Sequence, residues 1–217
     1  MRSAIIEAVK KEKIIAIIRG VESKKIIPLA KALYDGGIRL LEITYSADGK
    51  TSDDETAKNI EMLVKKFDGK MFIGAGTVLT EKQVELTAQA GGRFIISPDV
   101  YEPVIRRTRE LKMVSMPGAL TPSEIRAAMR AGADFVKVFP TVSLGAAYIK
   151  AVKAPLSDVK LLAVGGVNDR NMAEFYKVGV CGFGIATNIT DKKMIAENDF
   201  EGIKKLAEKY VAVAKAL

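Results

Sequence analysis

The chain has 217 residues, with 34 lysines and arginines, 26 aspartates and glutamates and no histidine, so its net charge is +8. The lack of histidine excludes histidine-based acid–base catalysis and histidine-ligated metals, and the single cysteine, Cys181, excludes an internal disulfide and a thiolate zinc cluster. No apolar run approaches the roughly 20 residues of a membrane-spanning helix, and Glu7 interrupts the stretch where a signal peptide would be apolar.

Eight short runs rich in β-branched residues alternate with longer amphipathic stretches. Because these runs are continuously hydrophobic, they are typical of strands covered on both faces, as in a parallel sheet. In chain order, the expected strands are Ile14–Ile18, Ile38–Ile43, Met71–Ala75, Phe94–Ser97, Met113–Met116, Phe135–Phe139, Leu161–Val164 and a weaker one at Gly179–Ile185.

Helix-start signals follow several of the expected strands. Capping boxes, in which an N-cap side chain and the side chain three residues later each bond the other's backbone, are expected at Ser52–Glu55, Thr80–Gln83 and Thr121–Glu124. Asp99 and Asn168 are expected as further helix caps. Glycines end several of these helices one or two residues before the next strand begins.

Eight strand–helix units predict a single compact (β/α)8 barrel of the TIM type that spans residues 1–217. The chain is short for this fold, which typically needs about 250 residues. Residues 1–10 are expected to form a helix that closes the base of the barrel, and residues 200–216 the last helix. A doubly wound open sheet is the alternative, but the segment after the first strand, Arg19–Val21, has only one glycine of the usual fingerprint.

The positive charges are scattered over separate segments, and no recognised nucleic-acid motif accompanies them. We therefore expect solvated helix faces, with neither nucleic acid nor a membrane as a partner. A mildly positive field favours a small anionic metabolite. A reducing cytoplasm suits a chain with one cysteine.

Two ionisable side chains, Glu42 and Lys137, fall inside apolar strands near the end where barrel enzymes place their functional groups. Desolvation lowers the pKa of a lysine, and a neutral lysine is a nucleophile toward carbonyl carbons. With histidine absent, Glu42 is the natural group to move protons. The alternatives are a lysine whose charged end reaches water, or a plain buried ion pair.

Other strand ends offer groups for an anionic substrate. Arg19 follows the first strand, where a guanidinium can bind a carboxylate through two hydrogen bonds, although a surface arginine is the alternative. Gly165 and Gly166 follow the seventh strand, and the segment 182–187 ends the eighth. Barrel enzymes often bind phosphate at these two loops, so a phosphate site is expected there, with a simple turn as the alternative.

Together these segments resemble the class I 2-keto-3-deoxy-6-phosphogluconate (KDPG) and 4-hydroxy-2-oxoglutarate (KHG) aldolase family, which includes the 2-dehydro-3-deoxy-6-phosphogalactonate aldolases. The resemblance covers essentially the whole chain. Its most specific motifs are Gly74–Val78, Ile96–Pro98, Met116–Gly118, Lys137–Pro140 and Gly165–Val167, and the galactonate enzymes also share Ala163–Gly166.

The resemblance implies a metal-independent lyase that cleaves a 2-keto-4-hydroxy acid reversibly to pyruvate and an aldehyde, either glyceraldehyde 3-phosphate or glyoxylate. No metal or other cofactor is expected, because an iminium on the lysine accepts the electrons of the breaking bond. It also implies a homotrimer. The implied roles are a Schiff-base lysine at Lys137, a general acid–base at Glu42, carboxylate binding by Arg19 and Thr77, pocket walls at Pro98 and Phe139, and substrate binding by Gly165, Gly166 and Thr187.

Two segments depart from the family pattern. After the second strand the family often has Thr-x-Arg-Thr-Pro, whereas Thr44–Lys50 is longer and lacks that arginine. In the eighth strand Ala186 and Thr187 replace a common Gly-Ser pair, so the hydroxyl is kept but a methyl is added where phosphate would approach. These departures leave open a non-catalytic phosphometabolite-binding barrel. A phosphosugar isomerase or epimerase is a further alternative, but such enzymes commonly rely on histidine.

Overall fold

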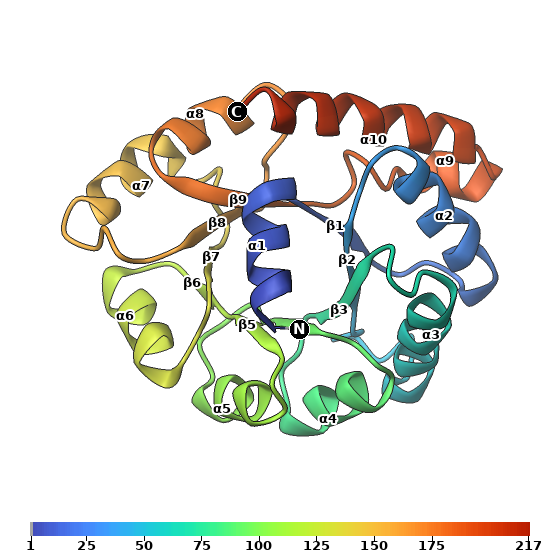
Figure 1. Ribbon diagram of the computed structural model, residues 1–217, viewed down its shortest axis with the longest axis horizontal. Helices are drawn as coiled ribbons and strands as arrows, with labels where there is room; N and C mark the ends of the chain where they lie inside the picture. The colour runs from blue at the N-terminus through green and yellow to red at the C-terminus, as the bar shows by residue number, and fades with distance from the viewer. Residues whose placement is uncertain (1) are drawn as a thin grey trace.

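A parallel sheet closed into a barrel forms the centre of the protein, and the computed structural model describes it over residues 2–217 (Figure 1). The strands follow the order β5-β4-β3-β2-β1-β9-β8-β7-β6. Their bounds are β1 (Ile14–Ile18), β2 (Leu40–Thr44), β3 (Phe72–Gly76), β4 (Phe94–Ile96), β5 (Val114–Met116), β6 (Gly118–Ala119), β7 (Val136–Val138), β8 (Leu161–Val164) and β9 (Val180–Ile185).

The barrel closes through Pro117. β5 and β6 lie at opposite ends of the strand order, yet only this residue separates them in sequence, so they are two halves of one bent strand. Proline has no N–H to donate, but the carbonyl of Pro117 accepts a hydrogen bond from the Lys137 N–H at 2.8 Å. β5 pairs with β4 and β6 pairs with β7. The predicted eight-unit barrel is therefore confirmed, and the open doubly wound sheet is excluded.

Helices surround the barrel on all sides (Figure 1). No helix between residues 2 and 217 is long and apolar enough to cross a membrane. The helices are α1 (Arg2–Glu12), α2 (Ser23–Asp35), α3 (Asp53–Lys66), α4 (Glu81–Gln89), α5 (Glu102–Glu110), α6 (Pro122–Ala131), α7 (Gly145–Lys153), α8 (Met172–Lys177), α9 (Lys192–Glu197) and α10 (Phe200–Lys215).

The three expected capping boxes form to different extents. Thr121 makes the complete reciprocal box with the side chain three residues later. The side chains of Ser52 and Thr80 each accept a backbone hydrogen bond, but no hydrogen bond from their own N–H groups to the side chain three residues later completes the box. Those side chains have other partners: the Glu55 carboxylate accepts from a serine of α2, and the Gln83 amide accepts from the Leu79 N–H and donates to Asp53. These helices therefore start where the sequence predicts them. The side chains of Glu55 and Gln83 form hydrogen bonds to neighbouring helices.

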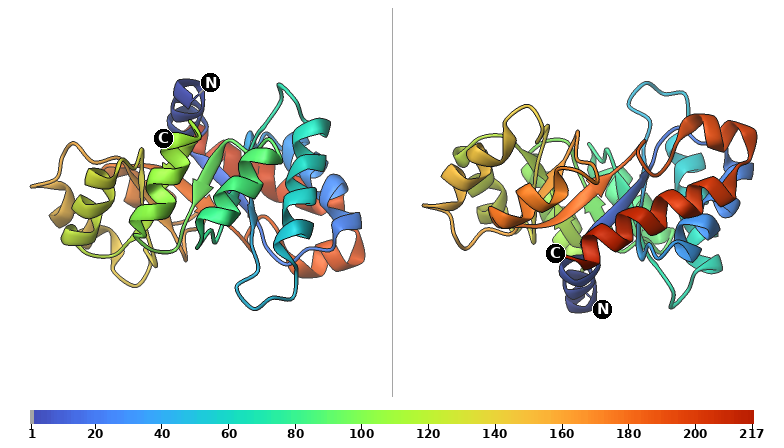
Figure 2. Two further views of the ribbon diagram at one scale, coloured as in Figure 1. Left: turned by 90° about the horizontal axis from the view of Figure 1, so that it is seen from below. Right: turned by 90° about the horizontal axis from the view of Figure 1, so that it is seen from above.

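Helix α1 closes one end of the barrel, which we call the base, and Figure 2 shows it projecting from that end. Ile5 and Val9 are buried against the lower interior of the barrel. Arg2 forms an ion pair with the buried Asp134, which also accepts a hydrogen bond from the Ser115 N–H at 3.0 Å. The expected base helix is confirmed, although Met1 lies outside the described residues.

Glycines on β3 and β9 leave room for large side chains inside the barrel. A Cβ on Gly74 would lie 2.3 Å from the Phe94 ring, and a Cβ on Gly182 would lie 2.9 Å from Leu162. Phe94 and Leu162 are fully buried and fill the lower interior together with the side chains of α1. The lower interior of the barrel is therefore filled by apolar side chains. We call the carboxyl ends of the strands the mouth.

Candidate active site

Glu42 and Lys137 lie on opposite walls of the barrel interior. Glu42 is on β2 and Lys137 is on β7, four positions apart around the ring of strands in either direction when β5 and β6 count as one. Lys137 is in register with Leu162, which belongs to the interior cluster, and Glu42 is in register with Gly74. Both side chains are buried, with exposed fractions of 3% for Glu42 and 8% for Lys137.

Burial drives both groups toward their neutral forms. It raises the pKa of Glu42, against the opposing positive charges of Lys137 and Arg19. It lowers the pKa of Lys137, which the negative charge of Glu42 partly counteracts and the positive charge of Arg19 reinforces. Within residues 2–217 the ion pairs do not join Glu42 to Lys137, so a plain ion pair does not describe the site.

The end of β3 is shaped around the Glu42 carboxylate. A Cβ on Gly76 would lie 1.6 Å from Glu42 Oε1, so the carboxylate occupies the space that any other residue would fill. The next residue, Thr77, has a φ of +54°. This left-handed conformation is rare for a β-branched residue, and such strained residues cluster at functional sites. Thr77 was expected at the substrate carboxylate, and its strained backbone turns at the mouth beside Glu42.

Phe139 and Pro98 stand at the rim of the mouth near Lys137. The Lys137 Nζ lies 4.8 Å from the centre of the Phe139 ring, and Phe139 is 41% exposed. Pro98, half-buried, follows β4.

The next residue, Asp99, was expected to cap a helix, but that was wrong, because α5 begins only at Glu102. Its negative charge acts instead on Lys137, whose pKa it raises.

The glycine pair after β8 packs tightly against the loop after β7. Gly165 and Gly166 have φ values of +91° and +78°. A Cβ on Gly165 would lie 3.1 Å from the Phe139 ring, and one on Gly166 would lie 2.3 Å from Val142. Glycine is thus required for the turn and for close packing, so the simple-turn interpretation accounts for part of this sequence.

In the loops after β8 and β9, three backbone N–H groups have no partner among the backbone carbonyls of the described loops. Among the backbone hydrogen bonds of the described loops, none is donated by the N–H group of Gly166, Thr187 or Asn188. The Asn171 side chain donates to the Gly166 carbonyl at 3.0 Å and so turns that peptide. Asn168, expected as a helix cap, instead accepts a bond within the loop, because α8 begins four residues later. Free N–H groups on two adjacent loops can bind an anion.

Arg19 is exposed at the end of β1 and lines a pocket of about 380 Å³. Thr187 and Ala186 line the same pocket, whereas Thr77 does not. The sequence resemblance groups Arg19 with Thr77, while the structure places it in one pocket with Thr187.

The unusual segment after β2 begins with a residue that packs against α4 and continues as an exposed loop. Tyr45 is buried, and its hydroxyl donates to the Gln83 carbonyl at 3.1 Å and contacts the Thr87 hydroxyl at 3.0 Å, both on α4. Burial raises the pKa of Tyr45 to about 12. Asp48 and Lys50 pair with each other in the exposed loop that follows.

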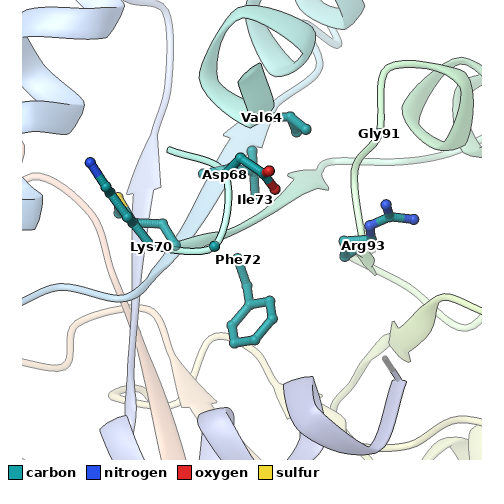
Figure 3. A pocket seen from close by; sticks show the side chains of 9 residues that line it. Val64, Asp68, Lys70, Phe72, Ile73, Gly91 and Arg93 are labelled. Atoms are coloured by element: carbon teal, nitrogen blue, oxygen red, sulfur yellow. The ribbon is translucent and has the colours of Figure 1, made fainter. Parts of the chain in front are cut away.

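A second hollow lies at the base, where β3 and β4 begin, and is remote from the mouth (Figure 3). Asp68, Lys70 and Arg93 line it together with apolar residues such as Phe72. No group of three or more acidic, cysteine or histidine side chains in residues 2–217 could hold a metal ion.

Sequence reasoning missed two residues of the mouth besides Asp99. Gly76 was noted only as part of a motif, because its role depends on a clash with Glu42 that appears only in three dimensions. Val164 ends β8 on the inward face, two residues after Leu162, and its methyl groups would lie 2.9 Å from a Cβ on Gly184. The rule that strand ends carry function identifies both positions.

Comparisons with known proteins identify the family of this chain. A family model described as KDPG and KHG aldolase matches residues 5–206. The probable 2-dehydro-3-deoxy-6-phosphogalactonate aldolase of Rhizobium meliloti (strain 1021) is 38% identical over 184 residues, covering 84% of each chain. The 2-dehydro-3-deoxy-phosphogluconate aldolase of Haemophilus influenzae (strain ATCC 51907 / DSM 11121 / KW20 / Rd) is 28% identical over 215 residues, covering 97% of each.

One solved structure also bears on the chemistry. It is KDPG aldolase from Legionella pneumophila with pyruvate captured at low pH as a covalent carbinolamine intermediate. It superposes with a TM-score of 0.84 and 29% identity, covering 94% of this chain and 96% of that one. The family expected from the sequence motifs is therefore confirmed: this chain belongs to the KDPG and KHG aldolase family.

Proposed function

We propose that this protein is a class I aldolase that uses Lys137 as its Schiff-base nucleophile and Glu42 as its general acid–base. The observation that carries the proposal is the arrangement of these two buried groups on opposite walls of the mouth, without a direct ion pair. A lowered pKa leaves more of the Lys137 amine neutral at a given pH, which a nucleophile requires. A raised pKa suits Glu42 to accept and return a proton.

The steps follow from this arrangement. The Lys137 amine attacks the C2 ketone of a 2-keto-4-hydroxy acid, and the carbinolamine loses water to give an iminium. Glu42 donates the proton that leaves with that water and then takes the C4 hydroxyl proton as the C3–C4 bond breaks. The electrons of that bond flow into the iminium, which gives an enamine and an aldehyde. Protonation at C3 and hydrolysis release pyruvate and restore the lysine.

The remaining residues are proposed to hold the substrate. Thr77 would bind the carboxylate beside Glu42, and Pro98 and Phe139 would form the walls on either side of Lys137. Phosphate would lie on the N–H groups of the loops that contain Gly165, Gly166 and Thr187. Arg19 is proposed to bind substrate as well.

The proposed substrate is a phosphorylated 2-keto-3-deoxy sugar acid, with the galactonate-derived acid favoured over the gluconate-derived one. The relative named for galactonate is 38% identical, against 28% for the relative named for gluconate. Ala163–Gly166 matches the galactonate pattern. Pyruvate release from the galactonate acid, the gluconate acid and 4-hydroxy-2-oxoglutarate, measured side by side with lactate dehydrogenase, tests this choice. A higher kcat/KM for either other acid would contradict it.

Borohydride trapping tests the central proposal. Reduction in the presence of pyruvate should add one pyruvate-derived group to the chain, and peptide mass spectrometry should find it on Lys137. Lys137→Met should give no adduct, whereas Lys160→Met, which changes an exposed lysine directly before β8, should behave as wild type. An unmodified wild-type Lys137 would overturn the Schiff-base mechanism and favour a binding protein or another barrel enzyme.

We further propose that residues 1–217 act as one domain and assemble as a homotrimer. The single closed barrel supports the first part. For the second, large exposed apolar side chains gather on loops at the mouth end: Leu79, Tyr101, Leu120, Phe139 and Val142. Apolar residues left exposed together in this way are typical of subunit interfaces.

A further inference from the structure

The hollow at the base of the barrel carries charges of opposite sign that the proposed function does not use. Its volume is about 220 Å³, and it lies where β3 and β4 begin (Figure 3). Pockets for drug-sized ligands have roughly 300–1,000 Å³, and one water occupies about 30 Å³. The hollow therefore suits a metabolite of roughly seven or eight non-hydrogen atoms, which is much smaller than a nucleotide.

Asp68 and Arg93 lie across this hollow from each other without forming an ion pair. Figure 3 shows Asp68 on the segment before β3 and Arg93 on the segment before β4. Both residues are exposed, and the ion pairs and side-chain hydrogen bonds of residues 2–217 engage neither of them. One carboxylate and one guanidinium are thus available to a molecule that enters between them.

Lys70 also lines the hollow, but its charged end is not aimed into it. In Figure 3 its side chain extends away from Asp68 and Arg93, and it lines a second hollow beside α1 as well. The charges that remain for a ligand are therefore one negative and one positive. A zwitterion matches both of them, whereas a phosphate ester or a dicarboxylate would bring a second negative charge to Asp68.

Apolar side chains make up much of the remaining lining. Ile73 is buried, and Val64 and Phe72 are half-buried. A Cβ on Gly91, whose φ is +85°, would lie 2.9 Å from Val64, so this glycine lets the turn before β4 pack against α3. The Arg93 N–H donates to the Ile73 carbonyl at 2.8 Å, which fixes the start of β4 beside β3. The wall is therefore a preformed surface for an aliphatic group.

We propose that this hollow binds a small α-amino acid with an aliphatic side chain, whose ammonium group pairs with Asp68 and whose carboxylate binds Arg93. A guanidinium can hold a carboxylate through two hydrogen bonds. The site is separate from the proposed aldolase activity, because none of the proposed reacting groups lines it. Since both ion pairs are exposed and individually weak, the dissociation constant should be on the order of 1 mM.

Isothermal titration calorimetry with L-valine as the probe tests this site, because valine matches the volume of the hollow. Valine should saturate at one equivalent per chain. Isovalerate lacks the ammonium group and isobutylamine lacks the carboxylate, so each should bind about 3- to 10-fold more weakly than valine. Glycine lacks the aliphatic side chain and should bind about 10-fold more weakly or worse.

Two substitutions assign the charged groups. Asp68→Asn should weaken valine binding about 3- to 10-fold and leave isovalerate binding unchanged, because isovalerate has no ammonium group. Arg93→Gln should weaken valine and isovalerate alike and leave isobutylamine unchanged. Asp54→Asn and Arg130→Gln change exposed residues that do not line the hollow, and should bind all the probes as wild type does. Thermal unfolding without ligand checks that every variant is folded.

Three outcomes would overturn the proposal. The first is a wild type that shows neither heat of binding nor a rise in melting temperature with valine at about 50 mM, where a ligand of this affinity stabilises the folded chain. The second is equal binding of valine and isovalerate, which would exclude recognition of a zwitterion. The third is unchanged valine binding in both Asp68→Asn and Arg93→Gln, which would place the amino acid elsewhere on the molecule.

Discussion

At the scale of single residues, the site depends on two charges that the barrel interior makes costly. A buried lysine and a buried glutamate each lose hydration, and their separation denies them the full compensation of an ion pair. Each therefore moves toward its neutral form. This is the state from which Lys137 can attack a carbonyl carbon and Glu42 can donate a proton.

The first prediction concerns Glu42→Gln, which keeps the shape of the side chain but removes its charge and its ability to accept a proton. We expect kcat to fall about 10²- to 10⁴-fold, the range of general acid–base contributions. The negative charge of Glu42 raises the pKa of Lys137, so its loss should lower that pKa further. The acidic limb of the pH profile for pyruvate imine formation should therefore shift to lower pH.

Pre-steady-state imine formation with pyruvate, measured between pH 5 and 9, checks this shift. Glu102→Gln changes an exposed glutamate at the start of α5 and should leave the profile unchanged. An acidic limb that stays in place, or moves to higher pH, in Glu42→Gln would show that the two groups are not electrostatically coupled.

At the scale of elements, neighbouring strands are matched so that one provides a glycine where the other provides a large or charged group. The prediction is that Gly76→Ala lowers kcat/KM at least about 10²-fold, because the added methyl displaces the Glu42 carboxylate and misplaced catalytic groups cost about this much. Gly202→Ala is the control, because its Cβ would meet only the carboxylate of Asp199 at the surface. Wild-type turnover in Gly76→Ala would contradict the proposed position of Glu42.

Helix α1 provides a test that separates stability from catalysis. Ile5→Ala should lower the free energy of unfolding by about 2–5 kcal/mol, the usual cost of truncating a buried isoleucine. Because α1 closes the base and the reacting groups lie at the mouth, the folded variant should keep wild-type kcat/KM. Urea unfolding and pyruvate release measure the two effects, with Ser3→Ala, an exposed residue of the same helix, as control. A folded Ile5→Ala that forms no imine would contradict this separation.

At the scale of the whole molecule, the proposed trimer gives a direct measurement. Sedimentation equilibrium should give three times the 23.5 kDa mass of one chain. Tyr101 is the most exposed aromatic residue at the mouth end, at 47%, so Tyr101→Glu should shift the mass toward that of one chain by placing a charge in an apolar interface. Glu102→Gln should not change the mass. A monomeric wild type would exclude the trimer.

Much of the barrel could be predicted because the strand signal is local. Continuous apolar runs identified every strand except β6 within about two residues, and β1 and β8 match their predicted bounds. The bend at Pro117 could not be predicted, because pairing of β5 with one neighbour and β6 with another depends on barrel closure. The helix starts at Asp99 and Asn168 were wrong for a related reason, since a polar residue before a helix signals a cap only if the loop is short.

The sequence by itself determined the class of fold, the family and the two ionisable residues in apolar strands, because hydrophobic periodicity and residue identity are properties of short segments. Only the tertiary structure decided that Glu42 and Lys137 face each other without pairing, that Gly76 makes room for the carboxylate, and that Arg19 shares a pocket with Thr187. These relations join residues far apart in the chain. They arise from the closure and register of the strands, which bring the first, second, seventh and last of them around one opening.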